Sequence, residues 1–325
     1  MFCSRRSYSN YRVDVANRVK KLNERNIMRK LKFKKIDAFS SYQSSGNPAG
    51  VIYMENFEEL NSDEMLKIAK ELKDFVSEVG FVCEERNHNF KLRYYSSKRE
   101  VEFCGHATIA IMYDLIKNRK DLLNKQHIII NTKNDRLVVE NRILSDNSIF
   151  ITSPHPKFRE LDIKQNNILS ALRVDKKMLD LTLDISIINS GLETLIVPMK
   201  NLDSILKVTP TINELKQFCI NSKIDIVILF SKECFDKTNS YRTRVFAATF
   251  GYLEDPATGS GNSAFGQYLL KRELWDGKLI TIEQNSNKEN YNTIKLVTKK
   301  ANNKVEVLFG GSANVKIDGE YFINT

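Results

Sequence analysis

Two short stretches of sequence, Phe103-Cys-Gly-His-Ala-Thr-Ile-Ala110 and Ala257-Thr-Gly-Ser-Gly-Asn-Ser-Ala264, decide the fold of this 325-residue chain. Each is a glycine turn followed by small residues that suit the start of a helix. The two stretches align with an offset of 154 residues (257 − 103), about half of the 296 residues (325 − 29) that follow residue 29. A repeat of this kind predicts two similar domains, each containing a helix that begins at its glycine turn. Chance similarity between two Gly/Ala-rich turns is the alternative.

Strand-length apolar segments surround both turns, which predicts an α+β fold. The expected strands lie near residues 31–36, 49–54, 75–82, 91–95, 127–131, 136–140, 148–152, 185–189, 193–198, 224–230 and 243–247, with more strands at the end of the chain. One helix is expected to begin after residue 61. Further helices are expected over residues 108–117, 211–222 and 262–272. Because Pro154-His-Pro156 interrupts this pattern, we place a domain boundary there. The domains are then residues 30–155 and 156–325, with the last strand free to return to the first domain.

The best-marked helix follows Leu60. Asn61 can accept hydrogen bonds from the first turn, and Glu64 can complete a capping box with it. Met65, Ile68 and Ala69, together with the apolar residue at i+7, form the stripe that we expect to face the core.

The excess of positive charge is confined to the beginning of the chain. Residues 1–35 hold twelve Lys and Arg residues and two acidic residues, so 38 basic (50 − 12) and 38 acidic (40 − 2) residues remain and cancel. A neutral body offers no basic surface for nucleic acid. We expect residues 1–29 to be a disordered basic extension. The alternatives are an upstream start codon ahead of Met28 and a mitochondrial-type targeting peptide, because Val15, Val19 and Leu22 share one helical face.

Composition also bounds the compartment and the cofactors. The chain has no run of about 18 apolar residues, so we expect no membrane span. The five cysteines include no Cys-x-x-Cys pair, and the four histidines are not spaced as metal ligands. We therefore expect no metal, no disulfide framework and a reducing, cytoplasmic location. An organelle is the alternative if the extension is a targeting signal.

A glycine turn at a helix N-terminus leaves main-chain N–H groups unpaired at the positive end of the helix dipole. Such an end can bind a carboxylate or a phosphate. Two of them flanking one cleft would suit a small carboxylate whose neighbouring C–H is deprotonated, because the N–H groups would stabilise the enolate-like charge.

Four motifs occur in order around these turns: Asp37-Ala-Phe39 with Gly46-Asn-Pro-Ala-Gly50, Ser77-Glu78, Glu100-Val-Glu-Phe-Cys-Gly-His-Ala-Thr108 and Glu254-Asp-Pro-Ala-Thr-Gly-Ser260. Together they resemble the PhzF-like family of phenazine-biosynthesis proteins, which shares its fold with diaminopimelate epimerase and proline racemase. The resemblance implies two pseudo-symmetric domains, each a mostly antiparallel sheet wrapped around a central helix. It also implies a homodimeric isomerase that shifts a proton in a small carboxylate-bearing substrate without metal or coenzyme.

The resemblance also implies roles for individual residues. Glu78 matches the acid/base glutamate of the family, and His106 and Asp255 match its other catalytic positions. The expected substrate-binding residues are Asn47, Gly105, Gly259, Ser260 and Gly261. The chain departs from the family pattern at Val79-Gly80, where many relatives have Thr-Ala, and at Asn262, where some have His. These departures leave the identity of the substrate open.

Cys104 supports a rival chemistry. In the epimerase and racemase relatives, two cysteines act as opposing acid and base beside the two glycine turns. Cys104 occupies the first of these places, but Thr258 occupies the second. Because a threonine hydroxyl is far too weak a base to replace a thiolate, two-cysteine inversion is disfavoured. The remaining rival is a one-sided epimerase or dehydratase that uses Cys104; the structural alternative is a small buried apolar residue.

Structural explanations also exist for the other candidate residues. Glu78 could be a surface charge, His106 a residue of a helix start and Asp255 an N-cap. A protein that keeps the fold and binds a small molecule without catalysis is the alternative in another functional class.

Overall fold

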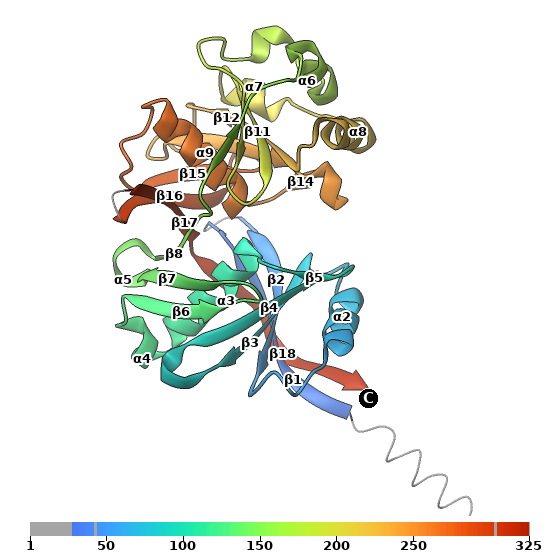
Figure 1. The fold of residues 1–325 in the computed structure, drawn as a ribbon, viewed down its shortest axis with the longest axis vertical. Helices are drawn as coiled ribbons and strands as arrows, with labels where there is room; N and C mark the ends of the chain where they lie inside the picture. Colours follow the sequence, from blue (N-terminus) through green and yellow to red (C-terminus); the bar gives the residue numbers. More distant parts are fainter. Residues whose placement is uncertain (1–27, 42–43, 302–303, 325) are drawn as a thin grey trace, which may run out of the picture.

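The computed structural model describes residues 28–41, 44–301 and 304–324 of the chain (Figure 1). The basic extension expected over residues 1–29 therefore lies outside the described residues, apart from Met28 and Arg29. These two residues belong to the first strand, so the expected boundary is two residues too late. The reason is that the Arg29 guanidinium donates hydrogen bonds to the Glu59 carbonyl and the Glu64 carboxylate, which holds the start of the strand against the fold.

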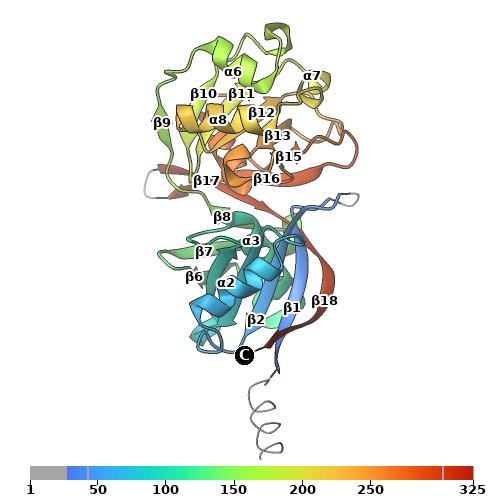
Figure 2. The ribbon, with the colours of Figure 1, turned by 90° about the vertical axis from the view of Figure 1, so that its right-hand side faces the viewer.

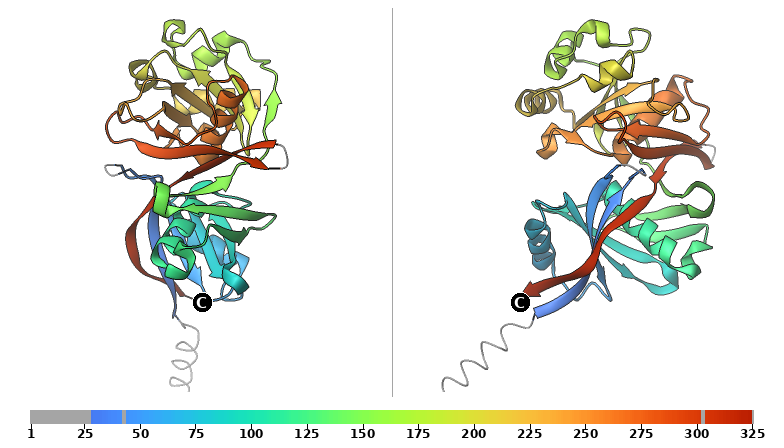
Figure 3. Two further views of the ribbon diagram at one scale, coloured as in Figure 1. Left: turned by 90° about the vertical axis from the view of Figure 1, so that its left-hand side faces the viewer. Right: turned by 180° about the vertical axis from the view of Figure 1, so that it is seen from behind.

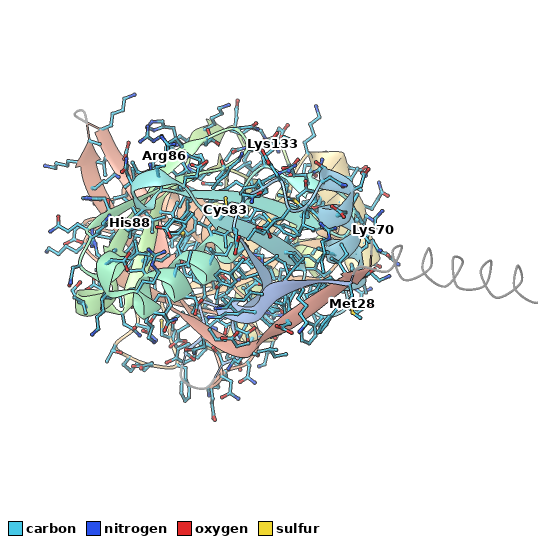
Figure 4. All side chains as sticks on the ribbon, turned by 90° about the horizontal axis from the view of Figure 1, so that it is seen from below. Met28, Lys70, Cys83, Arg86, His88 and Lys133 are labelled. Atoms are coloured by element: carbon cyan, nitrogen blue, oxygen red, sulfur yellow. The ribbon has the colours of Figure 1, made fainter. Side chains whose placement is uncertain are left out.

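The first half of the molecule is a sheet wrapped around the helix α3 (Gly105–Asn118). Its strands are β1 (Met28–Ala38), β2 (Asn47–Met54), β3 (Glu78–Glu84), β4 (Phe90–Ser96), β5 (Glu100–Val101), β6 (His127–Asn131), β7 (Arg136–Arg142) and β8 (Ser148–Thr152), joined by β18 (Ala313–Asn324). Its other helices are α2 (Ser62–Glu71), η1 (Arg86–His88), α4 (Lys120–Leu123) and α5 (Ile143–Asp146). Figure 4 shows this half from below, with Met28 labelled at the start of β1 and Lys70 on α2.

The second half repeats the arrangement around α9 (Gly259–Lys271). Its strands are β9 (Lys157–Arg159), β10 (Ser186–Asn189), β11 (Glu193–Pro198), β12 (Ile226–Ser231), β13 (Tyr241–Phe246), β14 (Glu254–Asp255), β15 (Ile280–Gln284), β16 (Asn292–Ala301) and β17 (Lys304–Gly311). Its other helices are α6 (Gln165–Leu172), η2 (Lys176–Met178), α7 (Leu202–Leu206), α8 (Ile212–Ser222) and η3 (Ala248–Phe250).

Strand pairing makes the repeat explicit. The first half runs β18-β1-β2-β3-β4-β6-β7-β8, and the second runs β9-β10-β11-β12-β13-β15-β16-β17. Corresponding pairs share their direction: β2 with β3 and β11 with β12 are parallel, as are β4 with β6 and β13 with β15, and the other ladders are antiparallel. Helix α3 packs against β1, β2, β3, β8 and β18, and α9 packs against β10, β11, β12, β16 and β17. The sequence-based prediction of two pseudo-symmetric, mostly antiparallel sheets around central helices is therefore confirmed.

The chain crosses between the halves twice. After β8, which belongs to the first half, β9 pairs with β10 of the second. After β17, which belongs to the second half, β18 pairs with β1 over eleven residue pairs from Met28↔Asn324 to Ala38↔Ala313. Figures 2 and 3 show β18 running along the first half beside β1. Because β8 and β17 also pair with each other, the two sheets are continuous.

Some predictions of single helices and strands are confirmed, and others are wrong. The capping box of α2 is present: Asn61 Oδ1 accepts from the main-chain N–H of Glu64 at 3.0 Å, and Glu64 Oε2 accepts from that of Asn61 at 2.9 Å. The strand expected from residue 75 begins only at Glu78, because a turn follows α2 and leaves Phe75 exposed. Helices α6 and α7 were not predicted, since eight and five residues are too short for a clear helical period. Within the described residues, no helix is long and apolar enough to cross a membrane.

Candidate active site

Helices α3 and α9 both begin against the same aromatic ring. Phe309 of β17 is 1% exposed and packs against the first residue of each helix. A Cβ atom on Gly105 would lie 3.2 Å from the Phe309 ring, and one on Gly259 would lie 2.4 Å from it. The two glycines therefore allow both helix N-termini to approach the ring closely. This contact gives the glycines a packing role that the sequence did not suggest, since we expected them to bind substrate.

The residues that precede the two helices are equivalent in the repeat. Cys104 is the N-cap of α3 and Thr258 is the N-cap of α9. Four residues later, Thr108 Oγ1 donates to the Cys104 carbonyl at 2.7 Å, and Asn262 Nδ2 donates to the Thr258 carbonyl at 2.8 Å. Asp255 is thus not the N-cap of α9, and the structural explanation that we considered for it is wrong.

Glu78 and His106 meet in front of α3. Glu78 is the first residue of β3 and His106 the second residue of α3. His106 Nε2 lies 3.4 Å from Glu78 Oε2, and the two side chains are 12% and 19% exposed. His106 Nδ1 lies 3.4 Å from the Cys104 sulfur, which is buried. The carboxylate and the imidazole are therefore in contact and reachable from solvent, whereas the thiol lies behind them.

Burial changes the protonation of this group of side chains. It lowers the pKa of His106, against the opposing effect of Glu78, so the imidazole is neutral at neutral pH. Burial also raises the pKa of the Cys104 thiol, and the Glu78 carboxylate raises it further. Since the thiolate is the reactive form of cysteine, Cys104 is poorly prepared to act as a base.

Asp255 supplies a second carboxyl group, from the second half of the molecule. Asn47 Nδ2 donates to its Oδ1 at 2.8 Å, and the Thr258 hydroxyl donates to its other oxygen. Burial raises the pKa of Asp255 to about 7; the Thr258 and Asn47 hydrogen bonds oppose this, and the Glu78 charge adds to it. The negative charge of Glu78 in the first half thus disfavours the charged form of Asp255 in the second half.

The expected substrate-binding residues differ in their burial and in their hydrogen bonds. Asn47 is buried, and its amide group donates to Asp255 and to the Ala257 carbonyl, at 2.8 Å in each case. Ser260 follows Gly259 as His106 follows Gly105, and its side chain makes no hydrogen bond within the described part of the chain. Gly261 is buried against Ile226. Of the polar side chains in this set, Ser260 is therefore free to bind a ligand, while the Asn47 amide holds Asp255.

Three residues were missed by reasoning from sequence. Gln284 and Asn292 are buried amides that bind the turn around Asp255. Tyr252 lies three residues before Asp255, and burial together with the charges of Asp255, Glu78 and Cys104 raises the pKa of its phenol. Single amides in strands and a tyrosine in a loop carry no sequence signal that would have identified them.

A mixed set of donors could hold a metal ion. Glu78, Cys104 and His106 each place one potential ligand atom within 4.8 Å of the others. The sulfur lies 3.4 Å from Nδ1 and 3.9 Å from Nε2 of the imidazole, so it sits beside the ring, and the ring would have to turn for both residues to bind one ion. The spacing of cysteines and histidines along the chain does not reveal this set, because its third member is a glutamate from another strand. The surface hollows at Arg159 and Thr249, and at Phe158 and Lys271, contain none of the site residues.

Comparisons with known proteins agree with this architecture. Residues 36–319 match the sequence model of the PhzC-PhzF family, described as phenazine biosynthesis-like protein. An "uncharacterized isomerase" of Clostridium acetobutylicum is 29% identical over 256 residues, which cover 76% of this chain and 82% of the relative.

Solved structures show the same fold. A Bacillus anthracis phenazine biosynthesis protein of the PhzF family superimposes with a TM-score of 0.79 at 24% identity, covering 91% of this chain and all of that chain (100%). A hydroxyproline epimerase from Agrobacterium vitis with bound trans-4-hydroxy-L-proline superimposes with a TM-score of 0.57 at 12% identity, covering 92% and 94% of the two chains. The fold is thus shared with PhzF-family and epimerase structures.

Proposed function

Because this chain belongs to the phenazine biosynthesis-like (PhzC/PhzF) family, we propose that it is an isomerase that moves a proton within a small carboxylate-bearing substrate, with Glu78 as general acid/base. One observation supports this proposal: Glu78 contacts His106 at the start of α3, Asp255 precedes α9 and is bound by Asn47 of the first half, and both helices begin against Phe309. The relative described as an isomerase supports the reaction class. The epimerase of the same fold that holds trans-4-hydroxy-L-proline supports a small carboxylate as substrate.

The proposed reaction transfers one proton. Glu78 removes it from a carbon next to the substrate carboxylate and returns it to another carbon of the same molecule, so a C–H bond breaks and a C–H bond forms. The helix N-termini of α3 and α9 stabilise the negative charge that develops meanwhile. With its pKa of about 7, Asp255 is available at neutral pH both as a hydrogen-bond donor and as an anion. One carboxylate that accepts and returns the proton needs neither metal nor coenzyme. We further infer a homodimer, which light scattering of the purified protein would test.

The cysteine-based rival is less well supported. Burial keeps the Cys104 thiol protonated. The equivalent position holds Thr258, whose hydroxyl donates to Asp255 and is therefore engaged in supporting a carboxyl group. A binding protein without catalysis stays the alternative in another class, and proton exchange into a substrate would exclude it.

The test compares substitutions of the two candidate bases. Substrates are sought by incubating the protein with a metabolite mixture in heavy water and detecting deuterium uptake by mass spectrometry. Glu78→Gln keeps the shape of the side chain but cannot take up a proton, so we expect a loss of about 10²–10⁴-fold in exchange. Cys104→Ala should cost no more than a few-fold, through lost contact with His106.

Cys83→Ala is the matched control, because Cys83 is also buried in the first half, in the core beneath α2. Melting curves of all variants exclude unfolding. Loss of exchange in Cys104→Ala beside an active Glu78→Gln would favour the cysteine-based rival.

A further inference from the structure

Four consecutive main-chain carbonyls around Asp255 are each bound by a different buried amide side chain. The carbonyls belong to residues 255–258, the turn that leads into α9. We call these four side chains the amide cradle. The bonds are Gln284 Nε2 to Asp255 O at 2.9 Å, Asn292 Nδ2 to Pro256 O at 2.8 Å, Asn47 Nδ2 to Ala257 O at 2.8 Å and Asn262 Nδ2 to Thr258 O at 2.8 Å.

Gln284 uses every hydrogen-bonding position that a glutamine side chain offers. Its Nε2 also donates to Thr258 Oγ1 at 3.1 Å, and its Oε1 accepts from the Thr258 N–H at 3.1 Å and from Asn262 Nδ2 at 2.7 Å. Two donors and two acceptor positions are thus all occupied. Because an unsatisfied buried amide is costly, a movement of the turn that breaks these bonds raises the free energy of the folded protein.

The amide cradle also joins the two halves of the molecule. Asn47 begins β2 of the first half, and its amide donates both to the Asp255 carboxyl group and to the Ala257 carbonyl. Asn292 begins β16 of the second half, and its Oδ1 accepts from the Gly46 N–H at 2.9 Å. Asn292 therefore binds the residue before Asn47 with one end of its amide and the residue after Asp255 with the other.

We propose that Asn292 and Gln284 are positioning residues that hold the Asp255 carboxyl group in place through the turn at residues 255–258. Their side chains are 2% and 0% exposed, so they act through the turn and do not contact substrate. The relevance to catalysis rests on the proposed function, whereas the positioning itself does not. A displacement of about 1 Å of a reacting group can lower the rate about 10²-fold. A buried polar network that prevents such a displacement would therefore preserve the rate.

The experiment measures the pKa of Asp255 by carbon NMR of the full chain labelled at aspartate carboxyl groups, and needs no substrate. The ionisable groups that face Asp255 are Glu78, Glu254, Cys104 and Tyr252, and all stay in place in the variants. In Asn292→Ala and Gln284→Leu we expect the pKa to fall from about 7 toward its usual value by roughly one pH unit or more, because a loosened turn admits water to the carboxylate. Asn292→Ser, which keeps one hydrogen-bonding group, should lower it less, and it serves if the alanine variant does not fold.

Asn141→Ala is the matched control. Asn141 also donates its amide to main-chain carbonyls, those of Leu123 at 2.8 Å and Lys125 at 2.9 Å, but it lies in β7 of the first half. Its loss should lower the melting temperature and leave the Asp255 pKa unchanged. An unchanged Asp255 pKa in folded Asn292→Ala and Gln284→Leu would overturn the proposal and leave both amides a purely structural role. A failure of the proposed function would appear separately, as undiminished deuterium exchange in Glu78→Gln.

Discussion

The pKa of Asp255 results from opposing effects, of which burial is the largest. Two hydrogen bonds, from Asn47 and Thr258, stabilise its charged form. Burial and the neighbouring Glu78 charge destabilise that form, and burial is the largest effect, so the pKa rises to about 7. A carboxyl group held this way can be neutral or charged near neutral pH, which suits acid–base chemistry better than an ordinary aspartate does.

Asp255 should therefore reduce the stability of the protein at high pH. Between the unfolded pKa of 3.8 and the folded pKa of about 7, the folded state binds a proton that the unfolded chain has released, so the free energy of unfolding falls as pH rises. Asp255→Asn removes this slope. We expect the variant to be more stable than the parent at pH 8 by up to about 4 kcal/mol, because about three pH units separate the two pKa values and each contributes roughly 1.4 kcal/mol. Urea unfolding of both proteins at pH 5 and pH 8 measures this. A constant difference between the two proteins at both pH values would contradict the expectation.

The two glycines beside Phe309 should differ in their tolerance of a side chain. A Cβ on Gly259 would lie 2.4 Å from the ring, and one on Gly105 would lie 3.2 Å from it. We expect Gly259→Ala to lower the free energy of unfolding by about 1–3 kcal/mol through overpacking. Gly105→Ala should be nearly neutral, because a small shift of the ring relieves the contact. Urea unfolding tests both, and Phe309→Leu in the Gly259→Ala background should recover stability if the ring is the cause.

At the scale of elements, the repeat preserves one ion pair in each half. Arg93 on β4 donates Nε to Glu100 on β5 at 2.8 Å, and Arg244 on β13 donates Nε to Glu254 on β14 at 3.0 Å. Glu100 and Glu254 are 154 residues apart, as are the starts of α3 and α9. In both halves the ion pair links a two-residue strand, which precedes the central helix, to the neighbouring strand of the sheet. The equivalent bonds show that the repeat extends beyond the glycine turns to the supports of the site.

The second of these pairs should matter more for stability. Arg244 is 4% exposed and also donates Nη1 to the carbonyl oxygen atoms of Ile205 and Val208, at 3.1 and 2.6 Å, which ties α7 to the sheet. We expect Arg244→Met to lower the free energy of unfolding by about 3–5 kcal/mol, because it leaves Glu254 and these carbonyls unpaired. Arg93→Met, in a more exposed pair, should cost about 1 kcal/mol. Chemical denaturation of both variants measures the difference, and equal losses would show that burial does not distinguish the pairs.

At the scale of the whole molecule, the sheet of the first half is completed by β18, the last strand of the chain. Strand β18 pairs with β1, and its Asp318 lies 3.5 Å from Lys34, which also binds Asp114 of α3. The first half therefore lacks an edge of its sheet until residues 313–324 have been placed. This arrangement makes the stability of the first half depend on the second.

Removal of residues 313–325 should therefore unfold the first half. Helix α3 would lose the β18 side of its packing surface, and β1 would lose eleven strand pairs. Hydrogen exchange followed by mass spectrometry should show loss of protection in β1, β2 and α3, with protection kept in β10–β13. The control is a chain that begins at Met28. We expect it to melt at the same temperature as the full chain, because the sequence of residues 1–27 is rich in basic residues and shows no core periodicity. Retained protection in the first half after deletion of β18 would show that this half is complete without it.

Local patterns in the sequence were enough to predict the fold class and the family, and they suggested the candidate site residues. Glycine turns, a capping box and alternating apolar residues are local signals, since they depend on the conformation of a few neighbouring residues. Glu78, His106 and Asp255 were named as candidates in this way; the structure places Glu78 in contact with His106 and Asp255 in contact with Asn47, and their roles stay predictions. The start of β3 was misjudged because an apolar run does not show where hydrogen-bond pairing begins.

Which distant groups meet depends on the tertiary structure. Asn47 and Ala257 are 210 residues apart, and nothing local to Asn47 indicates that its amide binds the Asp255 turn. The same holds for the contact of Phe309 with both glycines and for the Gln284 and Asn292 amides. These contacts depend on the register of strands and on how the two halves pack. They also determine burial, and burial is what raises the pKa of Asp255 and lowers that of His106.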